Sequence, residues 1–235
     1  MKKFKLTSEF IVDISGVKLF RIKALIEFGN VKAGDLGGYI EKEENLSHMG
    51  DAWVSDDARI SGNAQVFGNA QVFGDAQVFG DAWVFGNARI SGNAQVFGNA
   101  RVSGNAQVSG DTQVFGDARV FGDAWVFGNA RVSGNAQVSG NARVSGNARV
   151  SGDAQVFGDA RVSGDKDYAY AHGFGSCNRT TTFFRLKDGD VGVRCGCFYG
   201  TLAQFRDKVC ETHGETKKAQ EYLMLADLMK LRFEK

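Results

Sequence analysis

Three cysteines and one histidine near the end of the chain have the residue types of a structural zinc site: Cys195, Cys197, Cys210 and His213. Thiolates and imidazole nitrogens are ligands that zinc prefers. The spacing is loose, however, and a Cys-x-Cys pair within a strand places both side chains on one face without any metal. We expect small core thiols and no cofactor, with zinc as the alternative. A Cys–His nucleophile pair would need a third group to orient the histidine, and the sequence identifies none, so no catalytic residue is assigned.

These residues follow a long periodic segment that must position them. From residue 51 to 164 a six-residue unit, Gly-Asn/Asp-Ala-x-Val-Phe/Ser, repeats without an insertion, and its aliphatic residues run from Val54 and Ile60 to Val162. A short fixed period is typical of a solenoid, in which each unit buries its apolar face only against its neighbours. The sequence therefore predicts a mainly β solenoid.

Alternation along the strand decides which side chains line the interior. Ala and Val lie on one face of Ala-x-Val-Phe/Ser, and x and Phe/Ser lie on the other. Since x is Arg, Gln or Trp, a narrow interior cannot hold it in every unit, so we expect Ala and Val inside. Gly followed by Asn or Asp supplies the corner, because Gly adopts positive φ and Asn or Asp bonds to nearby backbone.

The repeat resembles the hexapeptide-repeat family, in which an aliphatic residue is followed four places later by a small one, as in Val54 and Ala58. The resemblance implies a left-handed parallel β-helix of triangular section, with three units per coil and about six coils. Acyltransferases of that family use a histidine base and a loop between coils. His48 is the histidine nearest the repeat. Leu46 and His48 fit the small and the aliphatic inward positions of a degenerate unit, so we expect a structural histidine at the mouth of the coil.

With three units per coil, outward side chains eighteen residues apart stack about one strand spacing, roughly 4.8 Å, from each other. Stacked aromatic side chains form an apolar patch, which on a soluble protein usually marks a partner or self-association surface. The alternative is that each Phe packs over its own corner with no partner. The residues expected to contact a partner or a second copy are Phe67, Phe79, Phe85, Phe97, Phe115, Phe121, Trp83, Trp125, Arg101 and Arg119.

Composition narrows the classes of partner and compartment. The formal net charge of +1 gives no support to a nucleic-acid binder, although the arginines gather in the second half of the repeat. The chain has no apolar run of membrane-spanning length, and Met1-Lys2-Lys3 is not followed by a signal-peptide core. We expect a cytoplasmic protein with reduced cysteines, a protein partner and a homo-oligomeric state, dimer or trimer.

The segments that flank the repeat have a different composition. The first 43 residues alternate as strands do, and they are expected to cover an open solenoid end, which would otherwise be an exposed sheet edge. Beyond the repeat, two strands over 181–187 and 191–198 flank the turn Asp188-Gly189-Asp190, and helices follow over 201–212, capped by Thr201, and 215–233. The expected parts are a β cap (1–43), a β-helix (44–164), a connector (165–180) and a ββαα module (181–235).

Short segments at the ends carry a second resemblance. Gly34–Glu41, Glu44–Ser47 and Cys195–Phe198 look like segments of uncharacterised repeat proteins of bacteria, phages and prophages, described as polymer-forming or hypothetical. The resemblance implies a small accessory protein of viral or mobile origin. We therefore expect a non-catalytic rigid binding protein that engages a host protein, in its sharpest form a defence-system inhibitor. The alternatives are a hexapeptide-repeat acyltransferase relative and a structural self-assembling polymer.

Overall fold

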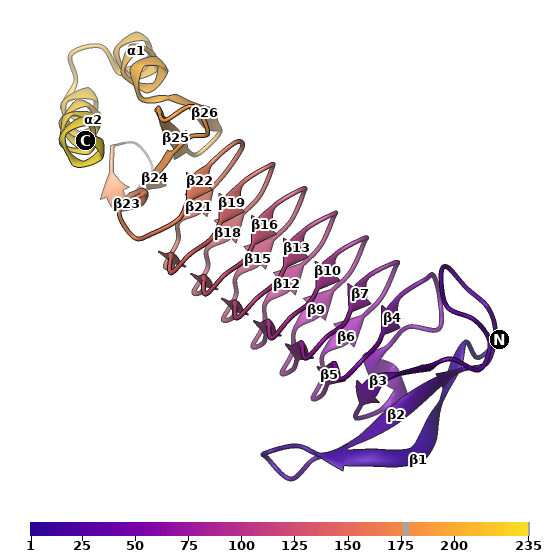
Figure 1. Cartoon of the computed structure of the whole chain (residues 1–235). Coiled ribbons are helices and arrows are strands. Elements are labelled where there is room, and N and C mark those ends of the chain that lie inside the picture. The colour runs from indigo at the N-terminus through magenta and orange to yellow at the C-terminus, as the bar shows by residue number, and fades with distance from the viewer. Residues whose placement is uncertain (176–178, 235) are drawn as a thin grey trace.

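The computed structural model describes residues 1–175 and 179–234. It shows a mainly β protein in which a long parallel solenoid carries a small β cap at its N-terminal end and a sheet with two helices at its C-terminal end (Figure 1). The predicted fold class is confirmed. The solenoid makes about seven turns, one more than expected, because the longest column of stacked strands has seven members.

Each repeat unit contributes one two-residue strand made of x and the aliphatic residue, and these strands stack into three faces. The first face consists of β4 (Trp53–Val54), β7 (Gln71–Val72), β10 (Arg89–Ile90), β13 (Gln107–Val108), β16 (Trp125–Val126), β19 (Arg143–Val144) and β22 (Arg161–Val162). The second face consists of β5 (Arg59–Ile60), β8 (Gln77–Val78), β11 (Gln95–Val96), β14 (Gln113–Val114), β17 (Arg131–Val132) and β20 (Arg149–Val150). The third face consists of β6 (Gln65–Val66), β9 (Trp83–Val84), β12 (Arg101–Val102), β15 (Arg119–Val120), β18 (Gln137–Val138) and β21 (Gln155–Val156).

The register confirms the predicted stacking at a spacing of eighteen. Arg89 pairs with Gln71 on one side and with Gln107 on the other, and all pairs within the three faces are parallel. Between turns, the N–H of an outward residue donates to a carbonyl of the following turn, as from Trp53 N to Ala70 O at 3.0 Å. The outward residues of the last turn and the inward residues of the first turn therefore lack a neighbouring strand.

The interior consists of the small and aliphatic residues that alternation assigned to it. Every Ala, Val and Ile at these inward positions, from Ala52 to Val162, is at most 1% exposed. Thr112 replaces an alanine in one unit, and its hydroxyl is buried without a hydrogen-bond partner among the described residues. An unpaired buried hydroxyl is unfavourable, so Thr112 is a local defect in an otherwise apolar lumen.

The corners combine glycine with a ladder of amides. At Gly104, φ is +67° and an added Cβ would lie 2.8 Å from the backbone nitrogen of Gly122 in the next turn, so both conformation and space require glycine. The residue after each glycine stacks on its equivalent. The amide of Asn87 donates to Asn105 at 3.0 Å, and Asn105 donates to Asp123 at 2.9 Å.

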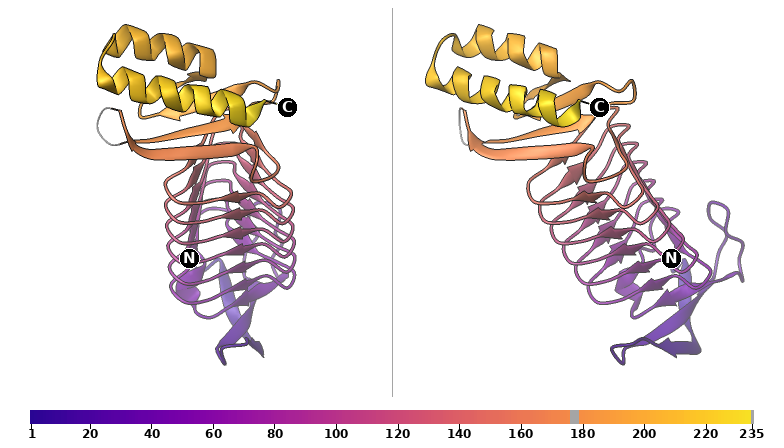
Figure 2. Two further views of the ribbon diagram at one scale, coloured as in Figure 1. Left: turned by 90° about the vertical axis from the view of Figure 1, so that its left-hand side faces the viewer. Right: turned by 60° about the vertical axis from the view of Figure 1, so that its left-hand side comes forward.

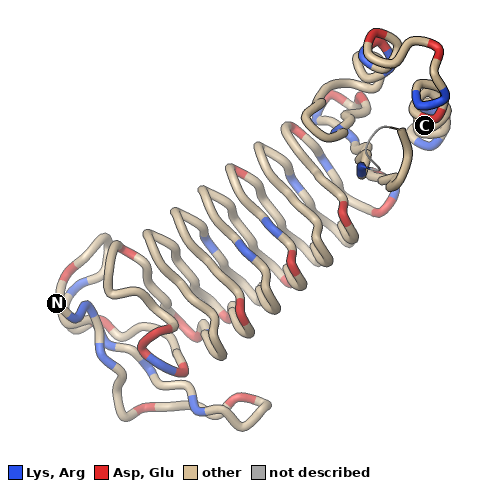
Figure 3. Tube along the Cα trace, turned by 180° about the vertical axis from the view of Figure 1, so that it is seen from behind, with Lys and Arg blue, Asp and Glu red and all other residues tan. Residues whose placement is uncertain are grey.

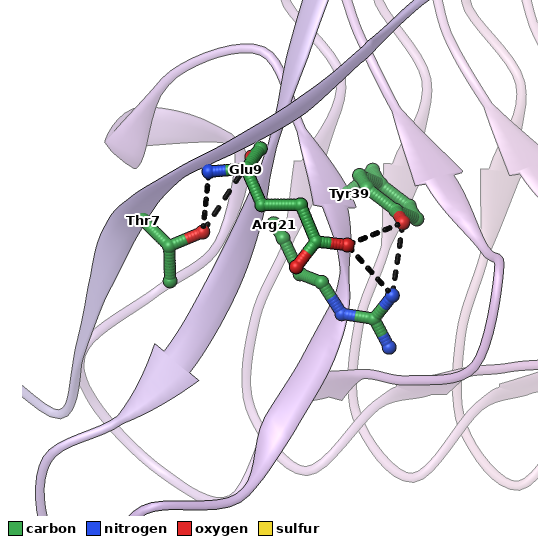
Figure 4. A network of polar contacts seen from close by, with 4 residues as sticks. All are labelled: Thr7, Glu9, Arg21 and Tyr39. Carbon is green, nitrogen blue, oxygen red and sulfur yellow. Dashed lines mark hydrogen bonds and ion pairs between the residues drawn. The ribbon is translucent and has the colours of Figure 1, made fainter.

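The N-terminal cap is formed by β1 (Phe4–Val12), β2 (Lys18–Ala24), β3 (Leu36–Ile40) and the short 3₁₀ helix η1 (Glu43–Asn45). The first three strands continue the sheet of the second face, with β3 parallel to β5 and the β1–β2 hairpin antiparallel. A polar network joins these strands (Figure 4). Arg21 donates to Tyr39 Oη at 2.9 Å and to Glu9 Oε1 at 3.3 Å, and Tyr39 Oη donates to Glu9 at 3.2 Å.

The C-terminal module has four strands where two were expected. They are β23 (Tyr168–Phe174), β24 (Arg179–Arg185), β25 (Val191–Cys195) and β26 (Phe198–Thr201), and they form one antiparallel sheet. The helices α1 (Leu202–His213) and α2 (Lys217–Phe233) follow, with Thr201 as the predicted N-cap of α1. The expected connector therefore contains a strand, because residues 168–174 pair with β24. Residues 176–178 of that segment lie outside the described residues.

The sheet of the module lies across the last turn of the solenoid, and the two helices cover its other side (Figure 2). The central strand β24 shows both contacts. Phe184 belongs to the core of the solenoid, whereas its neighbour Phe183 belongs to the core beneath the helices, and both are 0% exposed. Alternation along one strand thus joins two hydrophobic cores.

Candidate interaction surfaces

Outward phenylalanines form two stacks on different faces of the solenoid. On the second face, the ring centroids of Phe79 and Phe97 are 4.8 Å apart, those of Phe97 and Phe115 are 5.0 Å apart, and the planes are nearly parallel. On the third face, Phe67 and Phe85 stack at 4.9 Å. All five are only partly buried. Each ring covers its neighbour and still leaves apolar surface to solvent.

The second face has an uncharged middle between turns that carry arginine. Arg59 and Ser61 precede it. Beside the Phe79–Phe97–Phe115 stack lie Gln77, Gln95 and Gln113, and Gln113 donates to Gln95 at 3.2 Å. The following two turns carry Arg131 and Arg149 with serines after their valines. We call the six glutamine and phenylalanine residues the Phe/Gln strip. It is an uncharged patch on a sheet, and at one end Gln77, Phe79 and Gln95 line a hollow with the β1–β2 hairpin.

The predicted aromatic and arginine residues do not form one surface. Trp83, Arg101, Arg119, Phe67, Phe85 and Phe121 lie on the third face, whereas Trp125 lies on the first. The Arg101 guanidinium lies 5.0 Å from the Trp83 ring, and Arg143 lies 4.8 Å from Trp125. These contacts are cation–π pairs within the column, so each tryptophan already has a partner on one side.

Phe121 lies apart from the stacks. Ser103 separates it from Phe85, and Ser139 separates it from Phe157, because these are the intervening residues at a spacing of eighteen. Phe121 is 36% exposed and makes no ring contact with Phe85 or Phe157 among the described residues. Ser139, in contrast, is buried. The third face is therefore less continuous than the Phe/Gln strip.

The arginines of the solenoid carry charge that is not neutralised locally. Within the part of the chain that the structure describes, no arginine from Arg59 to Arg161 lies within 4.0 Å of a carboxylate. Acidic and basic residues are spread along the length of the solenoid (Figure 3). Such a mixed surface is typical of a solvated face rather than of a nucleic-acid site.

The cysteines and histidine of the C-terminal module are spread over several elements. Cys195 ends β25 and is half-buried, Cys197 lies in the turn before β26, and Cys210 is exposed on α1. The expected single strand over 191–198 is wrong, because the chain turns at Gly196, where φ is +60°. Across residues 1–175 and 179–234, no group of three or more His, Cys, Asp or Glu side chains could hold a metal ion.

His48 does not occupy the inward aliphatic position expected for it. Leu46 pairs with Val66 and is 1% exposed, so the degenerate unit is shifted and Leu46 fills that position. The His48 ring stacks on Phe4 at 4.4 Å, and its Nδ1 accepts from Lys3 N at 3.2 Å. The histidine is a structural contact between the cap and the first turn.

Two side chains that the sequence did not single out close the first turn. Lys3 Nζ donates to Gly50 O at 3.1 Å and to Ala52 O at 2.7 Å, and its side chain is buried. Burial lowers the pKa of Lys3 to about 8, although the negative charge of Asp51 acts to raise that pKa. Asn45 donates to Gly62 O at 3.1 Å and to Ala64 O at 2.8 Å. No residue pattern in the sequence predicts these contacts, because the partners of Lys3 and Asn45 are backbone carbonyls.

The comparisons with known proteins agree with the repeat architecture. Residues 58–74, 94–110, 124–140 and 136–152 match the family model described as YdcK Beta solenoid repeat. The matched segments cover less than half of the chain and lie within the stacked strands. No curated protein matches the chain. Among the described residues, no helix has the length and apolar character needed to cross a membrane.

Proposed function

We propose that this β-solenoid repeat protein is a rigid, non-catalytic scaffold that binds a protein partner through the Phe/Gln strip. The observation that carries the proposal is the uninterrupted stack of Phe79, Phe97 and Phe115, with centroid distances of 4.8 and 5.0 Å. Stacking fixes each ring, so a partner can bury them with little loss of side-chain entropy. The adjoining glutamines supply hydrogen bonds without the cost of desolvating charge.

The closed ends of the solenoid support a discrete particle over an end-to-end polymer. An open solenoid end is a sheet edge that another copy could extend. Here Lys3 and Asn45 occupy carbonyls of the first turn, and β24 covers the last turn. Association through a side face remains available, so the proposal includes a homo-oligomer. The setting of a phage or prophage protein acting on a host protein rests on the resemblance of the end segments.

Replacement of Phe97 and Phe115 by serine tests the proposal, because other units already carry serine at this position. The double variant should keep its fold, as judged by its circular dichroism and unfolding temperature. It should lose the protein that wild type captures reproducibly from a host lysate, or lose its oligomeric state. Phe127→Ser, at the equivalent position on the first face, is the matched control and should change neither.

Retention of both the captured protein and the oligomeric mass by the double variant would show that the Phe/Gln strip is not the interface. Loss in both the double variant and the Phe127→Ser control would point to general destabilisation. In that case hydrogen exchange of the affected turns distinguishes general destabilisation from loss of the interface. Loss of binding by the double variant without increased exchange supports the proposal.

A further inference from the structure

A separate pocket lies in the C-terminal module, away from the Phe/Gln strip. It has a volume of about 460 Å³ and lies between the β25–β26 hairpin and the two helices. Phe198, Phe205, Val209 and Tyr222 form its apolar walls, and three of these belong to the buried core of the module. Concave, mainly apolar pockets of this size are where proteins bind small molecules.

The walls of the pocket are held by ring contacts. Phe205 is 5.5 Å from Phe198 and 5.7 Å from Tyr222, the latter edge-on, and His213 stacks against Tyr222 at 5.7 Å. The Cys195 thiol accepts a hydrogen bond from Thr181 at 3.2 Å and lies 3.9 Å from the Tyr222 hydroxyl. Because these groups contact one another, the pocket is shaped before any ligand enters.

The charged side chains of the pocket are both positive. Arg179 and Lys208 line it, and no Asp or Glu of the described residues does. No carboxylate of the described residues lies within 4.0 Å of Arg179. Lys208 pairs with Glu211 at 2.8 Å, but both are exposed, and such pairs are weak. Arg179 is exposed and has no carboxylate partner among the described residues, so beside an aromatic pocket it favours an anion with an apolar body.

We propose that this pocket binds a small carboxylate with an aromatic or aliphatic body. The body would lie against Phe198, Phe205 and Val209, and the carboxylate would face Arg179, with Lys208 adding positive potential. Because the pocket and the Phe/Gln strip lie on different parts of the molecule, this site does not depend on the proposed partner binding.

Three probes of nearly equal shape test the charge preference on the full chain: 3-phenylpropionate, 3-phenylpropanol and 3-phenylpropylamine. Titrations followed by NMR or calorimetry should show that the carboxylate binds tighter than the alcohol and that the amine binds most weakly. Arg179→Gln should weaken the carboxylate about tenfold, as expected for one charge-assisted contact, and leave the alcohol unchanged. Lys217→Gln, an exposed lysine outside the pocket, should change nothing.

A bulky residue provides the second variant. Thr212→Trp places a large ring at an exposed helical position that lines the pocket, so it should block all three probes without disturbing the core. The proposal is overturned if no probe binds wild type at millimolar concentration, or if the amine binds as tightly as the carboxylate. It is also overturned if Arg179→Gln leaves carboxylate binding unchanged while Thr212→Trp abolishes it.

Discussion

The two ends of the solenoid leave different backbone groups without a neighbouring strand, and the chain closes them with different side chains. At the first turn the groups to be covered include carbonyl oxygens, and an ammonium and an amide donate to them: Lys3 to Gly50 and Ala52, and Asn45 to Gly62 and Ala64. At the last turn they include N–H groups. Asp165 accepts from Arg149 N at 2.8 Å, and Thr182 Oγ1 accepts from Gln155 N at 2.9 Å.

The difference follows from the direction of the hydrogen bonds between turns. In a parallel pair the outward residue bonds to the following turn through both its N–H and its C=O, so the last turn leaves outward N–H and C=O groups without a neighbour. The first turn leaves groups of its inward residues, among them the carbonyls of Ala52 and Ala64. A buried backbone group without a partner is unfavourable, so each cap must supply the opposite group. Both groups of Arg149 are served in this way, because the Tyr168 hydroxyl donates to Arg149 O and Asp165 accepts from Arg149 N. The caps are therefore not interchangeable.

The largest effect is expected at Asn45. Asn45→Leu leaves the carbonyls of Gly62 and Ala64 without their side-chain donor and removes the acceptor of Lys42 N. We expect a loss of about 3 kcal/mol in the free energy of unfolding, because these groups are buried at the end of the solenoid. Hydrogen exchange should rise in the first turns and stay unchanged in the last. Asn63→Ala, an exposed corner residue, is the control with a much smaller effect.

A pH dependence distinguishes Lys3 from the uncharged caps. Its pKa is about 8 in the folded protein and 10.5 when unperturbed, so the unfolded chain binds more protons between these values. The stability of wild type relative to Lys3→Met should therefore rise from pH 8 to 10.5, by up to about 3 kcal/mol, and be lowest below pH 8. Urea unfolding of both proteins across this range measures it. A flat difference would show that the burial of Lys3 does not penalise its charge, and Lys5→Met, at an exposed lysine, should show no such trend.

A smaller effect is expected at the opposite end. Thr182→Val keeps the shape of the side chain but removes the acceptor of Gln155 N, and Thr182 is 0% exposed. We expect a loss of about 1–2 kcal/mol, with increased exchange confined to the last turns and β24. Thr181→Val changes the other side of the same strand, where the hydroxyl contacts Cys195. If both variants increase the hydrogen exchange of the same amides, the side of β24 that faces the solenoid does not close the last turn independently of the side that faces the helices.

These contrasts also separate what the sequence predicts from what it does not. The register of the solenoid follows from its period, because Val and Ala fit only the interior and side chains eighteen residues apart then stack. The stacks of Phe79, Phe97 and Phe115 were predicted for the same reason.

The caps and the pocket depend on contacts outside the period. Lys3 and Asn45 bind carbonyls whose lack of a strand partner is known only once the first turn is located. The period alone predicts an inward position for His48, which is wrong because the pairing of Leu46 with Val66 shifts the unit by two residues, and no motif indicates that shift. Likewise the bend at Gly196 separates Cys195 from Cys197, and it depends on the pairing of β25 with β26.

The smallest predicted effect concerns the charge of the C-terminal cap. Asp165→Asn retains a side-chain oxygen that can accept from Arg149 N, so only the charge is lost, and Asp165 is exposed. We expect a change below about 0.5 kcal/mol, whereas Asp165→Ala, which removes the acceptor, should cost about 1 kcal/mol. Urea unfolding with hydrogen exchange of the last turn measures both. Equal losses for the two variants would mean that the last turn is closed by negative charge, and that the distinction between the two ends is electrostatic as well as a matter of donors and acceptors.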